Sequence, residues 1–193
     1  MRADLFQTDD DGARPEVANH RQAPGFGRYE LDVLGSDVAD VVDSAGGWLF
    51  DRVMAGWSVN VAVPDGADVR PLQILGVSTS PLEALLRGEH LSRGSAIALA
   101  GPLCSTHEKV REALVAAVRA GRSEITVWGE LWVAGLPQRG EQVRHQMSSA
   151  AATFKAQAMH AAGCAPARGA SFESFRSHGG CCRTDHPDLV PVG

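Results

Sequence analysis

The chain has 193 residues, of which 44% are hydrophobic and 21% charged. That length and apolar fraction suit one folded domain with extensions, and they exclude both a chain disordered throughout and a small disulfide-rich protein. The longest stretch without Asp, Glu, Lys or Arg has 14 residues, from Gly94 to His107. A membrane-spanning helix needs ~20 residues, so we expect no membrane association.

The formal net charge is −5 and it is unevenly distributed. Residues 1–65 hold twelve acidic and five basic side chains, and residues 101–163 hold five acidic and seven basic ones. A nucleic-acid-binding protein usually presents a basic face to the phosphates, so this balance argues against nucleic acid as a partner. The N-terminus lacks the apolar run of a secretory signal, which predicts a cytoplasmic protein with reduced cysteines.

The first predicted elements are a flexible acidic arm over residues 1–27, a strand over 29–33 and then a helix to about Ala55. Ser36 is the predicted N-cap of this helix, because its hydroxyl can accept a hydrogen bond from the first turn. The pair Gly46-Gly47 lies inside the helix, at a cost of about 1 kcal/mol for each glycine relative to Ala. The pair therefore predicts a kink or a close backbone contact.

The remaining elements alternate between strands and helices. Alternating or continuous apolar residues predict strands, and apolar residues at spacings of three and four predict helices. These patterns place strands over 57–63, 70–77, 96–100 and 124–133, a short helix over 81–87, and longer helices over 105–121 and 141–162. Ser105 and Glu108 form a capping box for the first of the longer helices.

This alternation predicts an α/β fold, with a mainly parallel or mixed sheet of about five strands flanked by helices. Residues 29–63 and 96–128 each follow the pattern strand, helix, strand, which suits two βαβ units. The runner-up is a ferredoxin-like α+β core over 29–100 with appended βα elements. A single α/β domain is predicted over residues 28–163, followed by an extended tail over 164–193 that contains cysteine and histidine.

The sequence contains none of the common phosphate-binding, dinucleotide-binding, serine-hydrolase or zinc-protease motifs. In an open parallel sheet, ligands bind beyond the carboxyl ends of the strands, where the strand order reverses. Two turns, 35–37 and 101–107, lead from a predicted strand into a predicted helix, and we expect them to open into one crevice. The ligand-binding candidates in these turns are Ser36, Asp37, Ser105 and Thr106.

The second turn also contains a thiol and an imidazole, those of Cys104 and His107. A helix N-terminus can lower the pKa of a cysteine and make it a better nucleophile, so these two residues are the catalytic candidates. In the plainer interpretation, Cys104 fills an apolar gap and His107 is solvated. Trp128 and Trp132, on one face of a predicted strand, form either a stacking platform or a surface that packs under a helix.

The tail is the candidate metal site, because Cys and His are the usual zinc ligands. These residues lack the paired C-x-x-C spacing of a zinc site, and adjacent cysteines project apart, so the alternative is an exposed tail with reactive thiols. We predict no cofactor, with zinc as the one alternative. The candidate metal ligands are Cys164, His178, Cys181, Cys182 and His186.

These features favour a non-catalytic regulatory module that binds a small ligand or a protein partner. Two alternatives stay open. One is a small transferase or hydrolase that uses Cys104 and His107, and the other is a metal-responsive or redox-responsive protein that acts through Cys181 and Cys182. The apolar stripe from Val143 to Ala158 also permits a homodimer.

Overall fold

The computed structural model describes residues 29–87, 96–121, 123–130, 140–165, 171–178 and 188–192, so the predicted acidic arm lies outside the described residues. In these residues eight strands form one sheet, in the order β3-β2-β1-β4-β5-β7-β6-β8. The strands are β1 (Glu30–Leu34), β2 (Ser58–Val63), β3 (Ser78–Pro81), β4 (Ala96–Ala100), β5 (Ile125–Trp128), β6 (Glu141–Gln146), β7 (Phe172–His178) and β8 (Val190–Pro191). The helices are α1 (Val38–Met54), α2 (Arg70–Ile74), α3 (Leu82–Arg87), α4 (Leu103–Thr106), α5 (Glu108–Ala120) and α6 (Ser149–Ala161).

Five neighbouring strands, β3-β2-β1-β4-β5, run parallel. The strands β4 and β5 are buried along their whole length, as expected of central strands covered on both faces. The pairs β1–β2 and β4–β5 are each joined through helices, which confirms the two predicted βαβ units. From β1 the chain moves to β2 and β3 on one side and then to β4 and β5 on the other, so the strand order reverses between β1 and β4.

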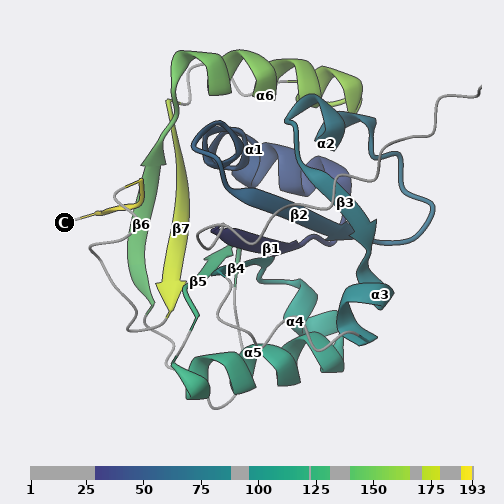
Figure 1. Ribbon diagram of the computed structural model, residues 1–193, viewed down its shortest axis with the longest axis vertical. Coiled ribbons are helices and arrows are strands. Elements are labelled where there is room, and N and C mark those ends of the chain that lie inside the picture. Colours follow the sequence, from purple (N-terminus) through teal and green to yellow (C-terminus); the bar gives the residue numbers. More distant parts are fainter. Residues whose placement is uncertain are drawn as a thin grey trace, which may run out of the picture.

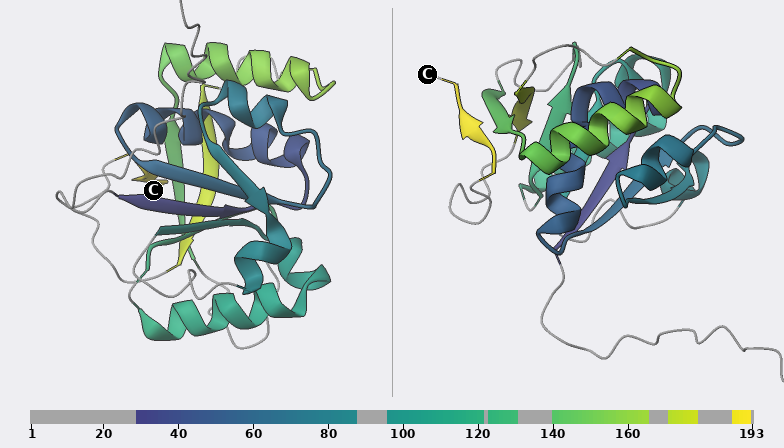
Figure 2. Two further views of the ribbon diagram at one scale, coloured as in Figure 1. Left: turned by 45° about the vertical axis from the view of Figure 1, so that its right-hand side comes forward. Right: turned by 90° about the horizontal axis from the view of Figure 1, so that it is seen from above.

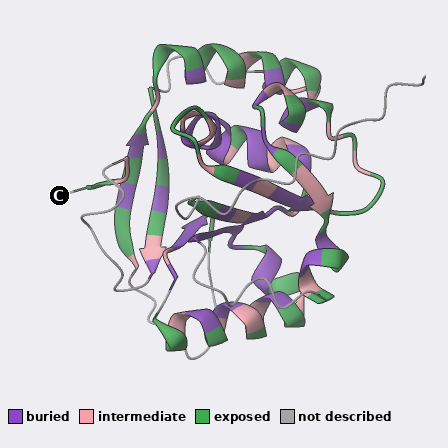
Figure 3. Ribbon diagram, in the orientation of Figure 1, coloured by how far each residue is buried: buried purple, intermediate pink, exposed green. Residues whose placement is uncertain are grey.

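Helices cover both faces of the sheet (Figure 1). Helices α1, α2 and α6 lie on one face, where α6 packs on α1 and α2, and α4 and α5 lie on the other face. The view from above in Figure 2 shows α6 lying across α1. Buried residues follow the central strands and the inward faces of the helices (Figure 3), and they form one hydrophobic core.

The fold class is confirmed as α/β, with a mostly parallel sheet between helices. The sheet is mixed, because β5, β7, β6 and β8 pair antiparallel, and it has eight described strands rather than about five. The ferredoxin-like alternative is wrong, because a split βαβ unit needs another strand between β1 and β2, whereas these two strands are direct neighbours.

The segment 70–77, predicted as a strand, instead contains the helix α2, and the edge strand β3 follows it. Pro71 stands at the start of α2, where its missing N–H costs no helical hydrogen bond. Leu72 and Leu75 are both buried, so apolar side chains three residues apart share one face of this turn. The apolar pattern of so short a segment fits both the period of a strand and the period of a helix, and the tertiary packing decides that it forms a helix.

The predicted helix over 105–121 consists of two helices, and the predicted capping box is wrong. Ser105 lies inside α4, while α5 begins at Glu108 with His107 as its N-cap, and the side chain of His107 makes no capping hydrogen bond. The predicted end is confirmed. Gly121 stands at the end of α5 with a left-handed φ of 62°, a conformation that glycine adopts at little cost.

The predicted helix over 141–162 is wrong in its first part, which forms β6. Val143 and His145 are buried and their neighbours are exposed, so the segment has a period of two. It pairs with β7, a strand that lies in the segment predicted to be an extended tail. The helix α6 starts only after Ser148, whose side chain accepts a hydrogen bond from the N–H of Ala151. A strand that pairs with a distant segment has no local signal that names its partner.

The division into arm, domain and tail stays a prediction. Of the helices in the described ranges, none combines the length and the hydropathy that crossing a membrane requires.

Candidate functional site

The two predicted turns leave the sheet at the same edge. Leu34, the last residue of β1, pairs with Leu99 of β4, so the turns that follow these parallel strands are neighbours. The strand order reverses between β1 and β4, and sheets of this kind bind their ligands at such a point. The first turn is tight because Gly35 has no side chain, since a Cβ there would lie 2.3 Å from Cγ2 of Val41 in α1.

Asp40 is at the centre of a polar group at this edge. Its Oδ2 accepts hydrogen bonds from Trp128 Nε1 at 2.9 Å and from Ser36 Oγ at 3.3 Å, and its Oδ1 accepts one from Ser44 Oγ at 3.2 Å. Asp37 caps α1 by accepting a hydrogen bond from the N–H of Asp40 at 2.8 Å, so the prediction of Ser36 as N-cap is wrong. We call Ser36, Asp37, Asp40, Ser44 and Trp128 the carboxyl-edge site.

Sequence reasoning predicts Ser36 and Asp37 as ligand-binding residues, which stays a prediction, and it does not include Asp40 and Ser44. Their signal is the spacing of four residues from Asp40 to Ser44, which places both polar side chains on one side of α1, next to the turn that contains Ser36. Trp128 is not an exposed stacking platform, because 3% of it is exposed and Asp40 uses its indole N–H. Its partner in the neighbouring strand β4 is Ala100.

Cys104, Ser105, Thr106 and His107 lie just after β4, in α4 and at the start of α5. Cys104 is 1% exposed, and burial raises the pKa of its thiol to about 11, although the charge of Arg111 acts in the opposite direction. An activated cysteine has a lowered pKa and some exposure. The burial of Cys104 therefore does not support catalysis by Cys104 and His107, which stays a prediction. Ligand binding by Ser105 and Thr106, both exposed, also stays a prediction.

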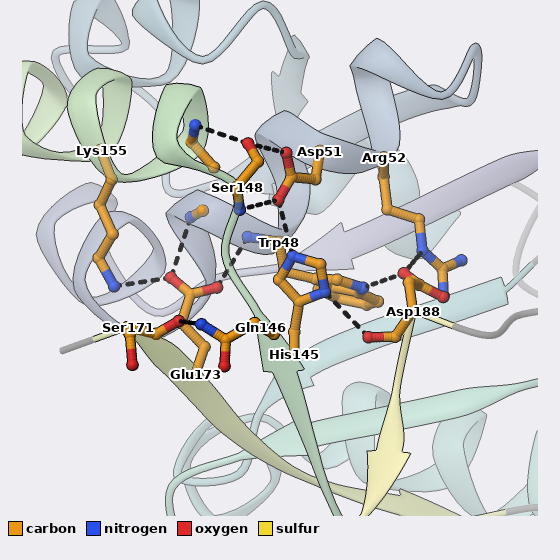
Figure 4. A network of polar contacts seen from close by, with 12 residues as sticks. Trp48, Asp51, Arg52, His145, Gln146, Ser148, Lys155, Ser171, Glu173 and Asp188 are labelled. Carbon is orange, nitrogen blue, oxygen red and sulfur yellow. Dashed lines mark hydrogen bonds and ion pairs between the residues drawn. The ribbon is translucent and has the colours of Figure 1, made fainter.

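A second polar group joins α1 to α6 and to the antiparallel strands (Figure 4). Asp51 Oδ1 accepts a hydrogen bond from Ser148 Oγ at 2.6 Å, and Asp51 Oδ2 lies 2.8 Å from Nε2 of His145. Burial alone would raise the pKa of Asp51, but the hydrogen bonds from Ser148 and His145 outweigh burial and hold the pKa below its usual range. The Nδ1 of His145 lies 2.9 Å from the carbonyl oxygen of Asp188, so these contacts also reach the segment before β8.

Arg52 is buried near the end of α1 and contacts two carboxylates. Its Nε lies 2.7 Å from Asp188 Oδ2, and its Nη2 lies 3.3 Å from Glu124 Oε1. Both ring nitrogens of His145 are occupied by acceptors, and no described contact joins its imidazole to a serine hydroxyl. This group therefore lacks a serine activated by histidine, and we assign it to the stability of the fold.

The described part of the chain contains no group of three or more His, Cys, Asp or Glu side chains that could hold a metal ion. Of the predicted metal ligands, Cys164 follows α6 and His178 ends β7, while Cys181, Cys182 and His186 lie outside the described residues. Metal binding and redox sensing therefore stay predictions.

No family model matches the chain, and no curated protein matches it in sequence. Solved structures match it in fold. A complex of a deacetylase with teicoplanin, from the biosynthesis pathway of teicoplanin, matches with a TM-score of 0.54 and 14% identity, over 84% of this chain and 98% of that chain. The deacetylase of the A40926 pseudoaglycone matches with a TM-score of 0.46 and 17% identity, over 69% and 81% of the two chains. At these sequence identities the similarity shows only a shared fold, and this conclusion rests on the match to the deacetylase–teicoplanin complex.

The comparison contradicts the expectation of a non-catalytic binding module. The structure that matches with a TM-score of 0.54 is that of a deacetylase, so the fold of this chain is one that an enzyme uses.

One matching deacetylase structure is a zinc-inhibited form, with a TM-score of 0.45, 13% identity and coverage of 68% of this chain and 82% of that chain. Zinc takes about four ligands from cysteine, histidine and carboxylate side chains. The carboxyl-edge site offers two carboxylates, those of Asp37 and Asp40, and three donors already engage Asp40. The described residues of this site do not fit a metal ion.

Proposed function

We propose that this chain is a hydrolase that removes an acyl group from an amide, and that Asp40 is its general base. The proposal rests on one observation. A half-buried carboxylate, held by three hydrogen bonds, stands at the carboxyl edge of the sheet where the strand order reverses. The fold supports the proposal, because the chain shares it with a deacetylase.

The hydrogen bonds of Asp40 leave it able to act on a water molecule. A carboxylate offers about four acceptor positions, and Trp128, Ser36 and Ser44 use three of them. The fourth position, on Oδ1, is suited to water. A general base must lie within hydrogen-bond reach of the proton that it removes, and a water molecule bound at this position would be within that reach.

In the proposed step, Asp40 accepts a proton from water while the water oxygen forms a bond to the acyl carbonyl carbon. The C–N bond then breaks and the proton passes from Asp40 to the leaving nitrogen, so a carboxylic acid and an amine are released. The N–H groups of Val38 and Ala39 lie in the first turn of α1 and have no acceptor inside the helix. They are suited to stabilise the negative charge that develops on the carbonyl oxygen.

The substitution Asp40→Asn tests this proposal. It keeps the shape of the side chain and removes the base, so we expect turnover of N-acetylated amines to fall on the order of 10²- to 10⁴-fold. The released amine is measured with fluorescamine over a panel of N-acetylated amines of different size, and the released acetate is measured by NMR.

The matched control is Asp68→Asn, which changes an exposed carboxylate that is paired with Arg70 and makes no described hydrogen bond to the carboxyl-edge site. We expect this variant to keep the activity of the unmodified protein. Equal activity of the Asp40→Asn and Asp68→Asn variants would remove Asp40 from the mechanism. Absence of turnover by the unmodified protein over the whole panel would count against the hydrolase itself.

A further inference from the structure

The helix α1 carries Asp40 and Ser44 of the carboxyl-edge site on its first half, and it changes direction along its length (Figure 1). In a regular α-helix, the N–H of Gly47 would bond to the C=O of Asp43. In this helix the N–H of Gly47 donates to Glu173 Oε1 at 2.9 Å, and the C=O of Asp43 accepts a hydrogen bond from Lys155 Nζ at 2.5 Å. Two side chains from β7 and α6 thus engage both ends of one expected helical hydrogen bond.

Lys155 and Glu173 form a pair that is largely removed from water. Lys155 Nζ lies 2.6 Å from Glu173 Oε1, and their side chains are 14% and 2% exposed. Glu173 Oε2 also accepts a hydrogen bond from the N–H of Trp48 at 2.7 Å. Burial raises the pKa of Glu173, while Lys155 and the two N–H groups act in the opposite direction.

The cost of burying this pair indicates a role in geometry. Removing two charges from water offsets most of their attraction, so a buried ion pair seldom stabilises a fold more than apolar side chains of the same volume would. The atoms that Lys155 and Glu173 bind are main-chain atoms in the middle of α1. The pair therefore acts on the path of the helix.

The contacts of the pair lead from the bend to the carboxyl-edge site. Asp43, whose carbonyl oxygen Lys155 binds, directly precedes Ser44. The hydroxyl of Ser44 bonds to Asp40, and Asp40 accepts the indole N–H of Trp128 on β5. The orientation of the first half of α1 relative to the second half therefore decides whether Asp40 reaches the indole N–H of Trp128.

We infer that Lys155 and Glu173 are positioning residues, which hold the first half of α1 in the direction that brings Asp40 to Trp128. The kinetic consequence rests on the proposed function. The structural consequence does not, because the hydrogen bond between Asp40 and Trp128 can be observed without any substrate.

The test compares Glu173→Gln and Lys155→Met with the control Glu108→Gln, each in the full chain. The control makes the same chemical change in an exposed ion pair, which Glu108 forms with Arg111 at 2.8 Å on α5. The first readout is the indole N–H signal of Trp128 in proton–nitrogen NMR spectra, identified by its loss in Trp128→Phe. The second readout is kcat and KM for the N-acetylated amine that turns over fastest.

We expect the indole signal to move in Glu173→Gln and in Lys155→Met by more than it moves in Glu108→Gln. The kcat should fall on the order of 10²-fold, because the base is displaced, while KM changes much less. Lys155→Arg keeps a cationic donor and should recover part of the kcat. A merely structural pair would lower the stability and leave the indole signal and the kcat of the folded fraction unchanged.

The outcomes separate this inference from the proposed function. If the indole signal moves but the unmodified protein hydrolyses no amide, the positioning role is supported and the proposed hydrolase activity is contradicted. Normal kcat and an unmoved signal in folded Glu173→Gln or Lys155→Met would overturn the positioning role and leave the hydrolase intact. If neither variant folds, Glu173→Asp takes their place, because it keeps the charge but draws the carboxylate back from the N–H groups of Gly47 and Trp48. An unmoved indole signal and full kcat in Glu173→Asp would overturn the positioning role, and a moved signal with a lowered kcat would support it.

Discussion

The carboxylates of Asp40 and Glu173 have different surroundings, and these decide what each can do. Both accept several hydrogen bonds, but Asp40 is half-buried at the edge of the sheet, whereas Glu173 is buried beneath α6. Water must reach a general base, so access to solvent separates the candidate base from the positioning carboxylate. Neither assignment follows from the residue type, because an isolated acidic residue has the same chemistry wherever it stands in a sequence.

At the same scale, we expect Cys104 to resist alkylation in the folded protein. Its thiol is buried and its pKa is raised to about 11, so little reactive thiolate is present and the reagent cannot reach it. Labelling with iodoacetamide at mildly alkaline pH, with and without urea, is followed by mass spectrometry of the peptide that contains Cys104. The label should enter this peptide only in urea.

Cys164 is the internal comparison for this experiment, because it is partly exposed and should be labelled sooner in the folded protein. Equal labelling of Cys104 with and without urea would show that the thiol is accessible. That result would restore Cys104 and His107 as catalytic candidates.

At the scale of the element, the two glycines inside α1 have different surroundings although they are adjacent. A Cβ on Gly47 would lie 2.2 Å from Sδ of Met147 and 3.3 Å from Oε1 of Glu173. A Cβ on Gly46 would have its nearest neighbour at 3.4 Å, on Leu75. The close contact predicted from the glycine pair is thus confirmed, and it belongs to Gly47.

We therefore expect opposite effects from alanine at these two positions. Gly47→Ala should lower the free energy of unfolding by about 1–3 kcal/mol, because Met147 must move. Gly46→Ala should be neutral or raise it by up to about 1 kcal/mol, because alanine favours the helix. Urea denaturation measures both effects. A stabilising Gly47→Ala would mean that Met147 does not press on α1, and recovery of stability in Gly47→Ala combined with Met147→Ala would show that it does.

At the scale of the whole molecule, polar contacts tie the antiparallel strands to the parallel half of the sheet. Asp51 at the end of α1 binds Ser148 at the start of α6 and His145 of β6. Asp188 binds Arg52 and thereby joins the segment before β8 to the same helix. Elements that lie far apart in the sequence therefore depend on one another through α1.

This arrangement predicts how stability depends on acid. The pKa of Asp51 is held below its ordinary value of 3.8, so its carboxylate contributes stability that is present above pH 3.8 and is lost as the pH falls further. Asp51→Asn should lower the free energy of unfolding by about 1–3 kcal/mol at neutral pH. Thermal unfolding of both proteins over a range of pH should show this difference shrinking below pH 3.8.

Asp65→Asn is the control for this measurement, because Asp65 is an exposed residue in a turn. Its effect on stability should be small at every pH. A difference between Asp51→Asn and the unmodified protein that stays constant down to the lowest pH would contradict the role assigned to the Asp51 carboxylate.

The sequence predicts the parallel half of the fold better than the antiparallel half. The strands β1, β2 and β4 and the helix α1 are each marked by their own apolar spacing, and neighbouring βαβ units need only local chain connections. The strand β6 reads as part of a helix, because Val143 and Met147 are four residues apart, and the segment of β7 shows too little periodicity to predict a strand. Their pairing with each other and with β5 is non-local, so no short window of sequence contains it.

The candidate site divides in the same way. The turn that contains Ser36 and Asp37 follows from the predicted boundaries of a strand and a helix. The rule that parallel strands end at the same edge of the sheet places this turn beside the turn after β4. Asp40 and its contact with Trp128 depend on α1 and β5 meeting across β4, which no local pattern encodes. The burial of Cys104, which decides its pKa, likewise depends on what packs around α4.

The sequence by itself determined the α/β class, the two βαβ units and the place of the turns after β1 and β4, because apolar periodicity and glycine positions act over a few residues. Only the tertiary structure decided that β6 and β7 extend the sheet, that Asp40 receives Trp128, and that Lys155 and Glu173 enter the bend of α1. The physical reason is that each of these features joins residues far apart in the chain. Such contacts form only when the chain as a whole folds, because folding brings these distant residues together and buries them.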